Sequence, residues 1–195
     1  MSIIIKVERD TDAQSPRGDC NFGAMVCWHR RYRLGDVQPK CDPQEWLADG
    51  GVPEGSVVLP LYLMDHGGIS MSTGDYGDRW DSGRVGWIFA DPDMIRKEHM
   101  LAADAEITAE IRASVERTLK SEVAVYSDYL EGNVWGYVIE NIHKCSECGS
   151  DVHDTGDDDS CWGFIGSDKS TLDAMKDHVD AKHHAALEAA WCNRG

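Results

Sequence analysis

The residues best suited to chemistry are two thiols three positions apart, Cys145 and Cys148, followed by Gly149. Thiolates at this spacing can reach one Zn²⁺ ion together, and a structural zinc site needs two further ligands to complete a tetrahedron. His178 and His183 supply them in the leading predicted set. We expect such a site to be structural, because four protein ligands leave no position for substrate.

Other interpretations of these thiols stay open. Three further candidate ligands lie closer to them in the sequence, namely His143, His153 and Cys161. The gap between Cys148 and His178 is 29 residues, whereas a compact zinc finger has about a dozen. Two free thiols in a polar hairpin, with histidines that face water, are the alternative.

A thiol beside an imidazole could also act as a nucleophile. The candidates are Cys27, His29, His66 and Cys161. Thiolate attack needs a base within hydrogen-bond reach, and nothing in the spacing shows that these residues converge. A cysteine-dependent hydrolase or transferase is the alternative hypothesis to binding. The chain has no P-loop, dinucleotide-binding glycine pattern, nucleophile elbow or HExxH motif.

Charge narrows the class of partner. The chain of 195 residues carries 19 Lys and Arg against 35 Asp and Glu, a net charge of −16. Such a chain repels nucleic-acid phosphate, so we expect no direct nucleic-acid binding and a protein with a basic surface as partner. The predicted partner-binding residues are the acids that gather in two loops: Asp75, Asp78 and Asp81, and Asp157, Asp158 and Asp159.

Two smaller features allow two interpretations each. Arg30, Arg31 and Arg33 form a basic spot, which is either a solvated loop paired with carboxylates or a contact for an anionic ligand. Four tryptophans lie beside Gly or Asp, and they indicate either core packing next to turns or an aromatic face for a protein partner. They are Trp80, Trp87, Trp135 and Trp162.

Location follows from what the sequence lacks. No apolar run approaches the roughly 18 residues of a membrane helix, and the first residues do not read as a secretory signal. The cysteine count of seven is odd, which favours reduced thiols. We expect a chain that stays in a cytoplasm, away from membranes; its oligomeric state is open.

The elements that must position these residues follow from local patterns. Apolar residues recur every three or four positions up to Leu130, which predicts a helix over about 105–130 that stops at Gly132. Asp42 and Asp91, each followed by proline, predict two helix starts. A final helix is expected over 170–190. Strands are expected over 2–7, 22–29, 57–64 (an edge strand or a bulge at its proline), 69–72, 84–90, 134–140 and 161–166.

This mixture predicts an α+β fold. We expect a largely antiparallel sheet, with the long helix and a C-terminal helix packed on one face, plus a zinc-knuckle-like hairpin. The length favours one domain, made of residues 1–140 and 159–195. Residues 141–158 are then an inserted Cys-rich hairpin.

Several phrases add a resemblance. They are NFGAMVCWHRRY at 21–32 with LGD at 34–36, LYLMDHGGI at 61–69, WDSG at 80–83 with VGWI at 85–88, GYVIE at 136–140, and DSCWGF at 159–164. Together they resemble a family of bacteriophage and mobile-element proteins without an established activity. The resemblance implies a biological setting, that of a small acidic accessory protein. In that setting the partner with the basic surface is a host protein, the location is the host cytoplasm, and the alternative hydrolase or transferase acts on a host factor. We expect binding that antagonises a host DNA-targeting defence system, because carboxylates can occupy a basic cleft in place of phosphates.

Overall fold

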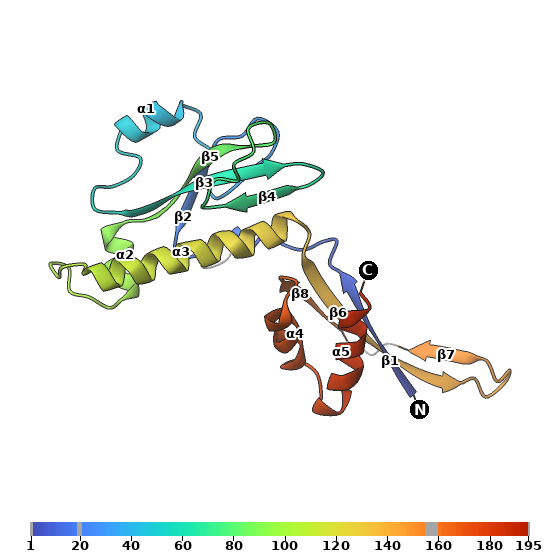
Figure 1. The fold of residues 1–195 in the computed structure, drawn as a ribbon. Helices are drawn as coiled ribbons and strands as arrows, with labels where there is room; N and C mark the ends of the chain where they lie inside the picture. The colour runs from blue at the N-terminus through green and yellow to red at the C-terminus, as the bar shows by residue number, and fades with distance from the viewer. Residues whose placement is uncertain (1, 19–20, 155–159, 195) are drawn as a thin grey trace. The chain divides into compact units, whose positions relative to one another are not determined.

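The computed structural model describes residues 2–18, 21–154 and 160–194. It has an α+β fold in which the paired strands are antiparallel (Figure 1). The contacts divide the chain into a central unit, residues 15–131, and a terminal unit, residues 1–14 with 132–195. This differs from the expected division into one domain with an inserted hairpin. The long helix and the C-terminal helices accordingly cover two different sheets.

The sheet of the central unit contains four strands in the order β2 (Ala24–Cys27), β5 (Ser82–Ala90), β3 (Val57–Asp65) and β4 (Ile69–Ser72). The register of β3 on β5 shifts between Leu61 and Tyr62. Pro60 itself is in register opposite Trp87, and the residue left over at the shift is Val85 of β5. Because β3 lies between β5 and β4, the expected edge strand or bulge at the proline is not what the structure has. Two short helices, α1 (Pro43–Ala48) and α2 (Pro92–Glu98), begin where predicted, and a single 3₁₀ turn, η1, spans Pro16–Gly18.

Helix α3 (Ala109–Leu130) covers one face of this sheet. It begins later than the expected residue 105, because the Thr108 side chain accepts a hydrogen bond from the amide of Ile111 and caps the helix. Its apolar stripe is buried as predicted, and Gly132 follows its end with φ +72°. The buried side chains of the helix are Val115, Leu119, Val123 and Tyr126.

Tryptophans cover the other face of the central sheet. The ring of Trp28 lies 5.5 Å from those of Trp46, on α1, and Trp87, on β5. Figure 1 shows α1 and α3 on opposite sides of the sheet. A Cβ atom at Gly51 would lie 2.2 Å from the Trp46 ring, so glycine after α1 lets this indole lie flat against the chain.

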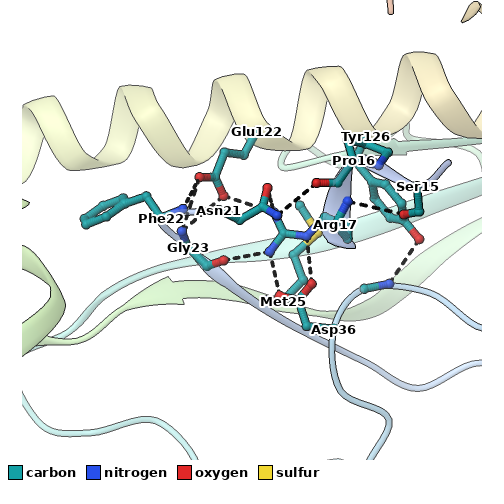
Figure 2. Close-up of polar contacts among 11 residues, drawn as sticks. Ser15, Pro16, Arg17, Asn21, Phe22, Gly23, Met25, Asp36, Glu122 and Tyr126 are labelled. Atoms are coloured by element: carbon teal, nitrogen blue, oxygen red, sulfur yellow. Dashed lines mark hydrogen bonds and ion pairs between the residues drawn. The ribbon is translucent and has the colours of Figure 1, made fainter. Parts of the chain in front are cut away.

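Arg17 ties α3 to the start of β2 (Figure 2). Its side chain is 95% buried, since its exposed fraction is 5%. All five N–H groups of the guanidinium have acceptors: Nε and Nη2 donate to Asp36, Nη1 to Asn21 and Glu122, and Nη2 also to the carbonyl of Gly23. Glu122 in turn accepts the amides of Phe22 and Gly23.

The segment after β2 is held along the free edge of that strand. The amide of Asp36 donates to the carbonyl of Met25 at 2.9 Å, and the amide of Cys27 donates to Val37 at 3.0 Å. Gly35 has φ +65°, and its amide donates to the Tyr126 hydroxyl at 3.1 Å. Residues 28–33 are thereby fixed at both ends on the central unit.

The sheet of the terminal unit is built on β6 (Val134–Lys144). This strand pairs along its length with β1 (Ser2–Arg9) and, on its other edge, with β8 (Ser160–Ile165) and β7 (Asp151–Asp154). Helices α4 (Lys169–Lys176) and α5 (His184–Cys192) supply the rest of its core. The buried residues of this core include Trp135, Tyr137, Leu172, Met175, Leu187 and Trp191.

The expected single final helix is broken into α4, a 3₁₀ turn η2 (Ala181–His183) and α5. The side chain of Asp168 accepts the amides of Ser170 and Thr171, so α4 begins with Asp168 as its cap. His184 explains the break, because its Nε2 lies 3.1 Å from the carbonyl oxygen of Lys176 and 2.9 Å from that of Val179. An N–H at this atom satisfies carbonyls at the end of α4.

Candidate functional site

The predicted acids of the central unit lie in an ordered loop, residues 73–81, which we call the acidic loop. Asp75 Oδ1 accepts the amide of Gly77 at 2.8 Å. Asp78 Oδ1 accepts the amides of Trp80 at 2.8 Å and Asp81 at 2.9 Å. These amides lower the pKa of Asp78, that of Asp81 first and that of Trp80 next. The carboxylate charge is therefore held in one place on the loop.

Trp80 is the most exposed large apolar residue among those described, with 94% of its surface accessible. Its amide is fixed by Asp78, and the next residue, Asp81, has its carbonyl bonded to the amide of Asp65 at 2.8 Å. The indole thus projects from a loop whose backbone is anchored on both sides. An exposed aromatic of this size, on a loop that also carries carboxylates, is typical of a contact residue for a partner.

A cleft of about 1050 Å³ opens beside Trp80. Its size reaches the upper end of common ligand sites, which hold about 300–1000 Å³. Positively and negatively charged side chains both line the cleft. Its polar side chains include His29, Arg30, Arg31, Asp65, Asp81 and Arg84.

Several of these charges have partners within the central unit. Arg31 Nη1 lies 3.4 Å from Asp65 Oδ2, and the Tyr32 hydroxyl lies 3.2 Å from both oxygens of that carboxylate. Asp81 Oδ2 lies 2.7 Å from Nδ1 of His66. The basic spot therefore contains an arginine paired with a carboxylate, as one of its two interpretations expects, while Arg30 also lines the cleft.

The catalytic candidates are only partly brought together. Cys27 and His29 line the same cleft, and His66 adjoins it through Asp81, but Cys161 lies on β8 of the terminal unit. Cys27 is fully buried, and burial, with Asp36 adding to it, raises its pKa to about 12. His29 Nδ1 accepts the amide of Tyr32 at 3.1 Å, so the lone pair of this nitrogen is engaged by the backbone. A protonated, buried thiol is a poor nucleophile.

The predicted metal ligands also lie in separate places on the terminal unit. Cys145 and Cys148 share the turn that joins β6 to β7, in which the amide of Gly149 donates to the carbonyl of Cys145 at 3.0 Å. His178 instead packs its ring on Phe164, with centroids 5.6 Å apart, and His183 ends η2. Over residues 2–18, 21–154 and 160–194, no group of three or more His, Cys, Asp or Glu side chains is placed to hold a metal ion. The zinc site with these four ligands stays a prediction.

Alkylation should separate the two kinds of cysteine. Hydrogen bonds from the side chain and backbone of Ser150, and then from the Cys145 thiol, lower the pKa of Cys148 to about 7. Near pH 7, iodoacetamide should therefore modify Cys148 first and leave Cys27 unmodified in the folded chain, as mass spectrometry of peptides would show. The same chain in urea is the control, since there Cys27 should react. Modification of folded Cys27 as fast as of exposed Cys192 would contradict the assignment.

Other sequence predictions have mixed outcomes. Asp157, Asp158 and Asp159 lie outside the described residues. Among the tryptophans, Trp135 is buried, as core packing predicts, whereas Trp80 and Trp162 are exposed. The contact of Tyr32 with Asp65 and the position of His184 between two helices were not anticipated. The one signal for Asp65 in the sequence is Gly67, two residues later, because a glycine of this kind marks a turn and so places Asp65 at the end of a strand.

No described helix has both the length and the apolar character that crossing a membrane requires. No family model, curated protein or solved structure matches this chain. The site must therefore be interpreted from its own geometry.

Proposed function

We propose that this chain is a binding protein that engages a basic surface of a protein partner through the acidic loop. The observation that carries the proposal is Trp80, which is 94% exposed on a loop that also carries Asp78 and Asp81. A lysine or arginine of the partner can lie over the indole face while Asp78 and Asp81 accept hydrogen bonds from its cationic group. Cation–π contacts contribute roughly 0.5–2 kcal/mol each, depending on how far the cation is desolvated.

Charge supports recognition at a distance. The net charge of −16 steers a basic partner toward the chain and accelerates association at low salt. Arg79 and Arg84 lie near Trp80 and oppose this attraction locally, although Arg84 lies over Trp87, 5.0 Å from its ring. We infer that Trp80 and its two flanking acids make the close contact, and that the acids elsewhere on the chain contribute mainly to the rate of association.

The proposal extends to the partner's identity. In line with the phage-type resemblance, we place this binding in the host cytoplasm and propose a DNA-targeting defence protein as the partner. Its basic DNA channel would be the surface that the acidic loop occupies. Duplex DNA should then compete with this chain for the partner, whereas a partner bound elsewhere would bind both at once.

The test is a binding series with variants. The chain is immobilised, proteins are captured from bacterial lysate at low and high salt, and the captured protein is purified for affinity measurements. Trp80→Ala should weaken binding about 10- to 30-fold, since hot-spot residues contribute about 2 kcal/mol or more. Neutralising Asp75, Asp78 and Asp81 with asparagine, which keeps the amide-accepting oxygens, should slow association.

The matched controls are Trp162→Ala, an exposed tryptophan of the terminal unit, and the neutralisation of three other exposed acids, Glu98, Asp104 and Glu106. The triple control changes the net charge equally and leaves the acidic loop intact. Equal retention of the partner by Trp80→Ala and Trp162→Ala would refute the proposed site. The absence of any captured protein at low salt would refute the proposed function.

A further inference from the structure

The turn between β6 and β7 holds two thiols at an exposed end of the terminal unit. Cys148 is exposed and Cys145 half-buried. Ser2, the first residue of β1, pairs with Ile142, so the turn lies beyond the part of β6 that β1 covers. Figure 1 shows this turn at the far end of the hairpin from α4 and α5. His178 and His183 lie on the segment that joins those two helices. A neighbouring molecule can therefore reach both thiols.

The hairpin that carries the turn lacks cover from the rest of its own unit. All four residues of β7 are exposed, Val152 included, and so are His143 and Lys144 at the end of β6. A two-stranded ribbon by itself is marginally stable in water. Charge at the turn is modest, because Lys144 pairs with Asp151 at 2.8 Å and Glu147 is the acid that remains. These properties suit a hairpin that is stabilised by contact with another molecule.

The coordination chemistry of zinc indicates what could bind at this turn. A structural Zn²⁺ site uses four ligands in a tetrahedron, and Cys₄ is a common set. One hairpin turn offers two thiols. We propose that Cys145 and Cys148 form half of a zinc site, which the same two residues of a second copy of this chain complete. Each thiol that binds loses its proton, so zinc uptake releases protons to the solvent.

This inference is independent of the proposed function, because it involves the terminal unit and the acidic loop belongs to the central unit. The two also differ in their response to salt. Two copies that each carry −16 repel one another, so salt should strengthen the zinc-linked dimer. Binding of a basic partner through the acidic loop should instead weaken as salt is added.

In the test, the reduced, metal-free chain is titrated with Zn²⁺. Elemental analysis then measures the bound metal, and light scattering measures the molar mass. We expect one zinc per two chains and a doubling of mass, with protection of the β7 amides from hydrogen exchange. With Co²⁺ as the probe, the thiolate-to-metal absorption should correspond to four thiolates per ion. Cys145→Ser and Cys148→Ser should each abolish the doubling, and Cys192→Ser, at another exposed cysteine, should leave it unchanged.

Three outcomes would overturn the inference. One is a zinc-loaded monomer whose metal is lost in His178→Ala or His183→Ala, which would establish the four-ligand site within one chain. Another is a dimer that forms equally well after Cys148→Ser, which would locate the contact elsewhere. The third is no zinc uptake by the reduced chain. None of these results depends on whether the acidic loop binds a partner, so the two proposals fail separately.

Discussion

Replacing Arg17 with methionine should lower the free energy of unfolding of the central unit by about 3–5 kcal/mol. Methionine keeps much of the side-chain volume but removes the cation and all five N–H donors. Asp36 and Glu122, whose side chains are only 26% and 16% exposed, would then carry charges without their main partner. An uncompensated carboxylate in such a place is more harmful than the loss of an ordinary hydrogen bond.

Amide hydrogen exchange of α3, followed in increasing urea, measures this effect within the central unit. Arg79→Met is the matched control, since Arg79 is an exposed arginine of the same unit, and it should change stability by less than about 0.5 kcal/mol. Adding Glu122→Gln to Arg17→Met should recover part of the loss, because the amide oxygen still accepts from Phe22 and no longer carries a charge. A loss below about 1 kcal/mol for Arg17→Met would mean that water replaces the guanidinium.

Local signals were sufficient for the helix starts and stops. Asp42 and Asp91, each before a proline, cap α1 and α2 as expected. Gly132 takes the left-handed conformation directly after α3 ends. Such signals act within one helical turn, so the side chain that satisfies the first amides is already adjacent in the sequence. The α+β class followed from the mixture of predicted strands and helices along the chain.

The division into two units could not be predicted from these patterns. It depends on the pairing of β1 with β6, which brings Arg9 opposite Trp135. Alternation shows that a segment can form a strand, but many strands present equivalent edges, and the partner is chosen by the packing of the whole core. The ion pair of Arg17 could not be predicted for the same reason. Nothing in the sequence around this arginine indicates that it pairs with Glu122 on α3.

The candidate site was predictable in its charge but not in its geometry. Asp75, Asp78 and Asp81 were identified from composition, because they lie in a stretch rich in glycine. Two of these carboxylates organise the loop itself by accepting its amides, which leaves Trp80 exposed. Tryptophan beside aspartate fits both a buried and an exposed position, so the sequence left that choice open. The paired histidines were expected on one helix, and the break at the end of α4 separates them instead.

Leu119→Ala should destabilise the central unit by about 2–5 kcal/mol. Leu119 is fully buried on α3, and its side chain fills the space above Gly23, where a Cβ atom would lie 2.3 Å from Leu119 Cδ2. Alanine removes the buried methyl groups and leaves a cavity that the sheet can only partly close. Val125→Ala is the control on the same helix, because Val125 is 43% exposed and should change stability little. Urea unfolding followed by α3 amide exchange measures both.

A double-mutant cycle makes the Leu119 prediction specific to this contact. Gly23→Ala alone should be strongly destabilising, since the new methyl group overlaps the Leu119 side chain. In the Leu119→Ala background the same methyl group enters vacated space, so Gly23→Ala should destabilise that variant less than it destabilises the parent chain, although Ile88 at 2.9 Å must still give way. Strictly additive losses would contradict direct packing of Leu119 on Gly23, because independent sites add and residues in contact do not. A non-additive result would show that the apolar stripe of α3, which the sequence predicts, meets the sheet at the start of β2, where Glu122 also accepts the backbone amides.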